Sequence, residues 1–213
     1  MHKVLDFIKK NKQFSFFLLL VILLALITIF APVIAPQDPY ASDLKNALQP
    51  PSSAHWFGTD KLGRDIFSRV IYASRSSLPA TLILVVLIFA IGTLLGTLAG
   101  YFGGWIDAVI MRISDMMISF PGMVLAIAVA GIMGASVKNA VIAVAVVSWP
   151  KYARLARSLV MKIRHEDYIY AAIVTGSKTS YILRKYMLPN IIPTLIITAA
   201  TDIGGMMLEL AGL

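Results

Sequence analysis

Two carboxylic acids lie inside an otherwise apolar stretch of this chain, where an ionisable group needs an explanation. Asp202 and Glu209 fall in the run from about Pro189 to Leu213. Their seven-residue spacing places both on one face of a helix, two turns apart. If the stretch crosses a membrane, such groups usually face a polar path or a partner helix. A second interpretation stays open, in which the helix shifts or breaks at Gly204-Gly205 and leaves Glu209 near the outer interface.

The other residue types that carry chemistry are absent or scattered. The chain has no Cys, which excludes thiolate catalysis and iron–sulfur ligation, and its three His residues form no His-x-x-x-His pair that would bind a metal. No Ser/His/acid set can be assigned. The run Gly176-Ser177-Lys178-Thr179 is only superficially like the end of a phosphate-binding loop, because Ser separates Gly from Lys and position 171 is Ala. The sequence predicts no enzyme, no catalytic residue, no metal site and no bound ATP.

The composition indicates that the two carboxyl groups belong to a bundle of membrane helices. Of 213 residues, 58% are apolar and 14% are charged, whereas soluble domains carry about a quarter charged residues. The mean hydropathy of +0.80 is also far above the soluble range. These values exclude a soluble enzyme, a disordered chain and a disulfide-stapled secreted domain. We therefore expect an all-α, polytopic bundle of transmembrane helices.

Five apolar stretches are long enough, or nearly so, to cross a bilayer, which takes about 20 helical residues. The fourth is short, so Lys138 and Lys151 must extend it and reach the two interfaces with their long side chains. Pro79 suits the first turn of the second span. The first span is too long for the apolar core of a cleaved signal peptide, which favours an uncleaved anchor. The five expected spans are Phe14–Ala35, Ser76–Ile106, Met116–Val137, Asn139–Pro150 with flanking residues, and Pro189–Leu213.

Small residues recur at every fourth position in two of these spans. This spacing places them on one helix face, where a neighbouring backbone can approach closely. The pattern favours a compact bundle without indicating a function. The stripes are Gly92, Gly96, Gly100 and Gly104 in the second span, and Gly122, Ala126, Ala130 and Gly134 in the third.

The distribution of Lys and Arg predicts the orientation, because basic residues favour cytoplasmic loops. An inside N-terminus, with Lys3, Lys9, Lys10 and Lys12, gives 13 basic residues inside and 6 outside. The chain then divides into a cytoplasmic N-terminus with the first helix (1–36), an extracytoplasmic loop (37–78) and a core (79–213). Within the core, 151–188 is cytoplasmic. This topology explains the net charge of +8 without a nucleic-acid partner.

The outer segment contains a long run of turn residues and alternating charges between His55 and Arg69. From its residues alone, this stretch should fold on itself over the membrane surface. The residues of interest are Gly58, Thr59, Asp60, Leu62, Gly63, Arg64, Asp65, Ser68 and Arg69.

The cytoplasmic segment predicts a short helix followed by a turn. Glu166 and Asp167 suit a helix N-terminus through the dipole. Ala171 and Ala172 leave a small, closely approachable face, and Gly176 can end the helix with a positive φ. The candidate residues are Tyr168, Tyr170, Ala171, Ala172, Gly176, Leu188 and Pro189.

With these two segments, the chain resembles the permease subunits of ATP-binding-cassette (ABC) importers, specifically the dipeptide/oligopeptide/nickel family. The outer run matches that family's H-x-x-G-T-D-x-L-G-R-D-x-x-S-R signature, and the cytoplasmic segment is similar to its coupling motif. Ala171, Ala172, Gly176, Leu188 and Pro189 match the motif, whereas Tyr170 and Tyr186 stand where the family usually has Glu and Ile. The resemblance implies a six-span type I importer fold, so a C-terminal part after Leu213 is expected to be missing.

The resemblance also implies a mechanism in which this subunit is not itself the catalyst. A second homologous permease would complete the translocation path, two ABC ATPase subunits would bind ATP and Mg, and an extracytoplasmic solute-binding protein would deliver a peptide or a nickel or other metal complex. The cytoplasmic helix would dock on one ATPase. The expected location is the inner (plasma) membrane, among lipid and without nucleic acid. The alternative is a secondary transporter or channel that uses Asp202 and Glu209 as ion sites.

Overall fold

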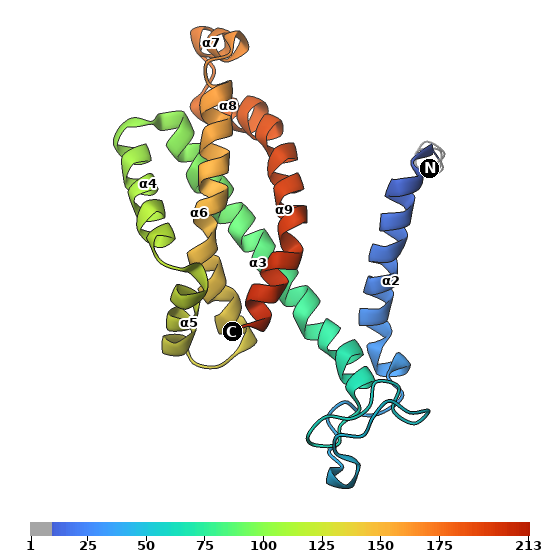
Figure 1. Ribbon diagram of the computed structural model, residues 1–213. Coiled ribbons are helices and arrows are strands. Elements are labelled where there is room, and N and C mark those ends of the chain that lie inside the picture. The colour runs from blue at the N-terminus through green and yellow to red at the C-terminus, as the bar shows by residue number, and fades with distance from the viewer. Residues whose placement is uncertain (1–9) are drawn as a thin grey trace. The chain divides into compact units, whose positions relative to one another are not determined.

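The computed structural model describes residues 10–213, which are almost entirely helical (Figure 1). Lys3 and Lys9, which contributed to the predicted orientation, lie outside this range. Within it no β-sheet occurs, and one isolated antiparallel bridge joins Thr59 to Asp65. The predicted all-α fold is confirmed. The helices are α2 (Lys12–Ile34), a 3-10 turn (Leu44–Asn46), α3 (Ile66–Phe102), α4 (Gly104–Ser119), α5 (Gly122–Met133), α6 (Val137–Ile163), α7 (Asp167–Val174), α8 (Thr179–Ile182), a π-helical turn (Leu183–Met187) and α9 (Leu188–Ala211).

The chain divides into two compact units, one ending at Leu78 and the other running from Pro79 to Leu213. Three helices of the described chain are long and apolar enough to cross a membrane, and a fourth span results if the bent pair α4–α5 is counted as one. Helix α6 is long enough at 27 residues but carries five Lys and Arg side chains. By length and apolarity, the described helices therefore give three or four membrane spans, fewer than the five that the sequence predicts.

The second span begins ten residues earlier than its apolar run. Helix α3 starts at Ile66 because the Asp65 carboxylate accepts a hydrogen bond from the Ser68 backbone N–H (2.8 Å), which caps the first turn. Pro79 therefore lies inside the helix and not in its first turn, which corrects the prediction. The helix ends at Phe102 because Gly103 has φ +64°. Residues 104–119, expected mainly as a loop, form α4.

The expected third span, 116–137, is wrong as a single helix. Helix α4 ends at Ser119, Phe120 is extended, and α5 starts after Pro121 at an angle of 94° to α4. Proline disfavours helical backbone in the preceding residue, so the helix ends there. Helix α5 is 12 residues long, too short to span alone.

In the unit from Pro79 to Leu213, α6 is the central helix, with α4 and α9 on its flanks (Figure 1). Helix α3 crosses it closely through the predicted glycine stripe. A Cβ at Gly96 would collide with the Ala153 backbone oxygen, and one at Gly100 would lie 2.8 Å from the Arg157 oxygen. Gly92 packs on Tyr152 and Trp149 in the same way. Gly104, the fourth member, belongs to α4 and has no atom within 4 Å of its Cβ position.

The stripe in α5 is confirmed only in part. Ala126 is buried in the core, and a Cβ at Gly122 would make an ordinary contact with Val147 of α6. Gly134 is exposed and ends the helix with φ +89°. Figure 1 shows α7 at one end of this unit, with α5 and the C-terminus at the other.

Candidate functional site

Helix α7 has one buried face and one exposed apolar face. Ile169 and Ala172 are buried and belong to the core of the bundle. Tyr170, Ile173 and Val174 point outward, with 50%, 49% and 86% of their surface exposed. A short helix that exposes apolar side chains while its opposite side is anchored has the form of a docking element.

The two neighbouring alanines do not form one face, which corrects the sequence interpretation. Ala172 is buried against the bundle, whereas Ala171 is exposed. Adjacent residues in a helix are about 100° apart, so burial of one turns the other outward. The face available to a partner is therefore Tyr170, Ala171, Ile173 and Val174.

Gly176 ends α7 in the left-handed conformation that the sequence predicted. Its φ is +80°. The Gly176 N–H donates to the Ile173 oxygen (2.9 Å) and the Ser177 N–H donates to the Ala172 oxygen (3.0 Å). This pair of bonds is a Schellman motif. The Thr175 hydroxyl also donates to the Ala171 oxygen (2.9 Å), so the Ala171, Ala172 and Ile173 carbonyls all accept hydrogen bonds at the end of α7.

The two tyrosines that depart from the family motif make contacts within the segment. The Tyr170 hydroxyl lies 3.0 Å from His165 Nδ1. The Tyr186 ring is 6.1 Å from that of Tyr168 and 5.9 Å from that of Tyr181. This aromatic cluster links α7 to the turns that follow it.

Those turns lead into α9 through a π-helical turn, Leu183–Met187. Ile182 and Met187 are fully buried and anchor it to the core. Leu188 and Pro189 form the first turn of α9, where the missing N–H of proline is tolerated. Leu188 is half-buried and Pro189 is exposed, so these two motif residues lie at the junction with α9 and not on the exposed face of α7.

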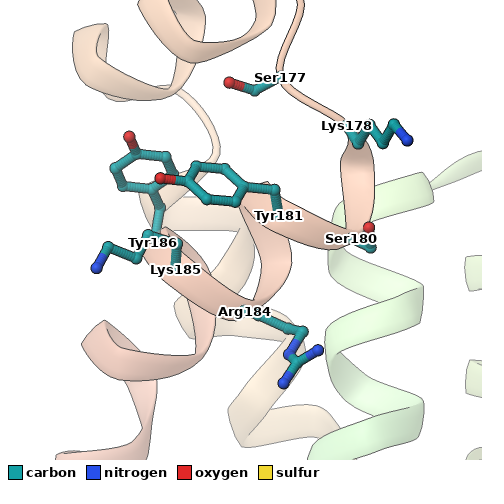
Figure 2. Close-up of a pocket in the computed structure, with 7 residues that line it drawn as sticks. All are labelled: Ser177, Lys178, Ser180, Tyr181, Arg184, Lys185 and Tyr186. Atoms are coloured by element: carbon teal, nitrogen blue, oxygen red, sulfur yellow. The ribbon is translucent and has the colours of Figure 1, made fainter.

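An open hollow of about 840 Å³ lies beside α7 (Figure 2). Its lining residues are Ser177, Lys178, Ser180, Tyr181, Arg184, Lys185 and Tyr186. None of its three basic side chains forms an ion pair within residues 10–213. The hollow is therefore positively charged.

Asp202 pairs with α6 across the bundle. Its carboxylate accepts hydrogen bonds from Lys151 Nζ (2.6 Å) and from the Tyr152 hydroxyl (3.0 Å). Lys151 therefore binds Asp202 of α9, and its expected position at a membrane interface stays a prediction. Helix α6 continues twelve residues beyond it to Ile163, which places Lys151 inside the helix. The pair joins α6 to α9.

Glu209 does not share this environment. Helix α9 continues unbroken past Gly204-Gly205, so the interpretation with a broken helix is wrong. Glu209 is exposed and forms no ion pair within the described chain. The two carboxyl groups thus lie on one helix but have different surroundings.

A second set of ion pairs, missed by the sequence analysis, joins α4 to α6. Arg157 donates to Asp107 through two nitrogens (2.5 Å each), and Arg154 donates to Asp115 (2.6 Å) and to the Ser114 hydroxyl (3.1 Å). The signal was present: Arg154 and Arg157 follow Lys151 at three-residue intervals, and Asp107 and Asp115 are two turns apart. The pairs were not predicted because residues 107–115 fell between the expected second and third spans and were not expected to be helical.

The outer segment folds on itself, as predicted. Asp60 connects several parts of this segment. The Asp60 carboxylate accepts hydrogen bonds from the backbone N–H groups of Leu62 (2.8 Å) and Arg64 (3.0 Å) and from the Arg64 side chain (2.8 Å). The Arg64 hydrogen bond lowers the pKa of Asp60 to about 2. The Arg69 Nε atom lies 3.6 Å from the Asp60 carboxylate. Asp60 therefore stays ionised throughout the physiological pH range.

Asp65 organises the other half of the outer segment. Besides capping α3, it lies 3.0 Å from His55 Nδ1. Burial opposes ionisation of Asp65, but the hydrogen bonds from Ser68 and His55 outweigh it and lower its pKa. The Ser68 hydroxyl in turn accepts the Gln37 backbone N–H (3.2 Å).

Two glycines make the outer turns possible. Gly58 and Gly63 have φ of +74° and +72°. A Cβ at Gly58 would collide with the Gln49 backbone oxygen, and one at Gly63 with that of Asp43. The Thr59 hydroxyl accepts a hydrogen bond from the Gln49 backbone N–H (2.9 Å). Leu62 is exposed. The outer signature is thus a set of interlocking turns.

Comparison with known proteins assigns the chain to a class of membrane permeases. The family model described as binding-protein-dependent transport system inner membrane component matches residues 92–213. The N-terminal transmembrane domain of oligopeptide transport permease C matches residues 2–51. The chain belongs to the binding-protein-dependent transport system inner membrane component family.

Individual relatives cover nearly all of the chain. It is 43% identical over 97% of its length to the dipeptide transport system permease protein of Alkalihalophilus pseudofirmus. It is 45% identical over 91% to the probable D,D-dipeptide transport system permease protein of Escherichia coli K12, and 38% identical over 92% to the nickel transport system permease protein of the same strain. The chain spans 68%, 65% and 71% of these relatives, respectively. The predicted family is confirmed.

Proposed function

We propose that this chain is a transmembrane subunit of an ABC importer, forming part of a translocation path and moving in response to ATPase subunits. The observation that carries the proposal is α7, whose apolar tip is exposed while Ile169 and Ala172 anchor it to the bundle. A partner that pushes on α7 would move the attached helices as a body, because α7 and α9 share one core.

The proposed partners are those that the family implies. The chain would pair with a second, homologous permease and with two ATPase subunits that hold ATP and Mg. A solute-binding protein would deliver the substrate on the outer side, where the outer segment 37–78 lies in this proposal.

The substrate class rests on the relatives alone. Their names indicate dipeptides, nickel and, for a protein of Pectobacterium atrosepticum, glutathione. We propose a short peptide or a metal complex as the cargo. A channel or secondary transporter built on Asp202 and Glu209 is less well supported, since Lys151 and Tyr152 already occupy the Asp202 carboxylate.

The proposed orientation places the N-terminus and 151–188 in the cytoplasm and 37–78 outside. It can be tested by introducing single cysteines at two exposed positions of this Cys-free chain, Ser53→Cys and Val174→Cys. In intact spheroplasts, an impermeant maleimide should label position 53 only, and position 174 should react after the membrane is opened. Labelling of 174 but not 53 in intact spheroplasts would reverse the topology.

Measurements of ATP hydrolysis test whether the partner subunits, and not this chain, hydrolyse ATP. The purified chain should show no ATPase activity, because it contains no phosphate-binding loop. Reconstituted with its partner permease and ATPase subunits, it should support hydrolysis that rises when the loaded solute-binding protein is added. Activity from this polypeptide alone, after removal of contaminating subunits, would contradict the proposal.

A further inference from the structure

The basic hollow beside α7 continues into an apolar groove. The groove has a volume of about 450 Å³ and lies between α3 and the start of α9. Apart from Thr93, Thr97, Ser180 and Arg184, its lining is apolar, including Phe89, Leu94, Leu98, Leu183, Leu188 and Ile192. Ser180 and Arg184 line both the hollow and the groove. A positive hollow and an apolar groove therefore meet at these two residues.

The junction lies close to the start of a candidate membrane span. The apolar segment that includes α9 begins at Thr179, directly after Lys178. The hollow therefore lies at the polar end of a membrane span, and the groove runs toward Ile192, further into the span. Tyr181 and Tyr186 at the hollow are side chains typical of the membrane–water interface.

Two buried hydroxyl groups in the groove have no partner. Thr93 and Thr97 are 6% and 4% exposed, and neither hydroxyl forms a hydrogen bond within the described chain. A helical threonine normally donates to the carbonyl four residues earlier. Leaving such a group unpaired is costly, so an acceptor that entered the groove and displaced the atoms now covering these two oxygens would be stabilised by them.

The charge of the site selects the ligand. Lys178, Arg184 and Lys185 lack carboxylate partners among residues 10–213, and no acidic residue lines either the hollow or the groove. Figure 2 shows the Arg184 side chain extending away from the two tyrosines. A ligand that fits must be anionic at one end, apolar at the other and able to accept hydrogen bonds between them.

We propose that this site binds an anionic phospholipid, with its phosphate at Arg184, where the hollow and the groove meet, and an acyl chain in the α3–α9 groove; Lys185 adds to the positive charge of the hollow. The ester oxygens, which lie between phosphate and chain, are the acceptors for Thr97 and Thr93. Basic pockets at the ends of membrane helices hold acidic headgroups in this way. The site would make the segment that carries α7 sensitive to membrane composition.

Native mass spectrometry of the purified chain in detergent tests the proposal. Palmitoyl-oleoyl phosphatidylglycerol should bind more tightly than phosphatidylcholine with the same acyl chains. Arg184→Gln with Lys185→Gln should weaken phosphatidylglycerol binding about thirtyfold and leave phosphatidylcholine unchanged, because two surface charges are removed. The matched control is Lys162→Gln with Arg164→Gln, which removes two exposed charges outside the site and should have no effect.

Two groove variants separate a lipid from other occupants. Ala90→Phe fills the groove and should lower the binding of both lipids. Thr97→Val keeps the side-chain shape and should weaken lipid binding while leaving the melting temperature of the lipid-free protein unchanged or higher. Water-soluble glycerol 3-phosphate should not displace the lipid.

Four outcomes would overturn the proposal. Equal binding of the two lipids to the unmodified chain would remove the role of the headgroup. Equal losses in the double variant and its control would reduce the effect to overall charge. Displacement by glycerol 3-phosphate at equal concentration, or a lipid-free dimer that Ala90→Phe dissociates, would identify a soluble phosphate or a second copy as the occupant.

Discussion

Gly96→Val should destabilise the folded bundle by about 3 kcal/mol, at the upper end of overpacking costs. A Cβ at this position collides with the Ala153 backbone oxygen and lies 2.8 Å from the Ala156 Cβ. Backbone and Cβ atoms cannot move aside by rotating, so α3 must separate from α6. In detergent, the expected loss in melting temperature is roughly 10 °C.

Gly204→Val is the matched control for this effect. Gly204 also lies inside a helix, α9, but nothing stands within 4 Å of its Cβ position. Its stability should change by less than about 0.5 kcal/mol. Equal melting temperatures for the two variants would show that the close crossing of α3 and α6 does not stabilise the protein.

Gly176→Val should uncouple transport while the protein still inserts into the membrane. Valine is strongly disfavoured at φ +80°, and the local strain is on the order of 1–3 kcal/mol. No atom lies within 4 Å of the Cβ position, so the effect comes from the backbone alone. Relief of the strain breaks the Schellman motif and changes the direction of α7. We expect at least a tenfold loss of uptake and weaker co-purification of the ATPase.

Gly176→Asn provides the control, because asparagine tolerates the left-handed region better than other side chains. It should retain ATPase binding and most of the uptake. Membrane fractions of both variants should contain normal amounts of permease, since the substitution lies outside the long apolar helices. Normal uptake and ATPase binding by the valine variant would show that the direction of α7 does not matter.

The sequence predicted most of the helical fold because apolar length and small-residue spacing are local signals. The glycine stripe at 92, 96 and 100 correctly indicated a close crossing, although it could not show that α6 was the partner. The errors fell where polar or proline residues decide a boundary. Asp65 extends α3 backward beyond its apolar run, and Pro121 divides the expected third span.

The candidate sites were predictable to different degrees. Gly176 could be assigned a left-handed conformation because its role is set by its own chain neighbours. The partners of Asp202 could not be identified, since Lys151 and Tyr152 are some fifty residues away in sequence and meet it only when α6 packs on α9. The opposite exposure of Ala171 and Ala172 likewise depends on how α7 sits against the core.

Site-specific photo-crosslinking is the most direct test of the claim that α7 receives the motion of an ATPase. Benzoylphenylalanine can replace Val174 in α7 or Ile132 in α5, which are 86% and 89% exposed and lie at opposite ends of the same unit (Figure 1). In membranes that contain the assembled transporter, irradiation should link position 174 to an ATPase subunit and leave position 132 unlinked to it. A crosslink to the ATPase from position 132, or none from position 174 in an intact complex, would contradict the account.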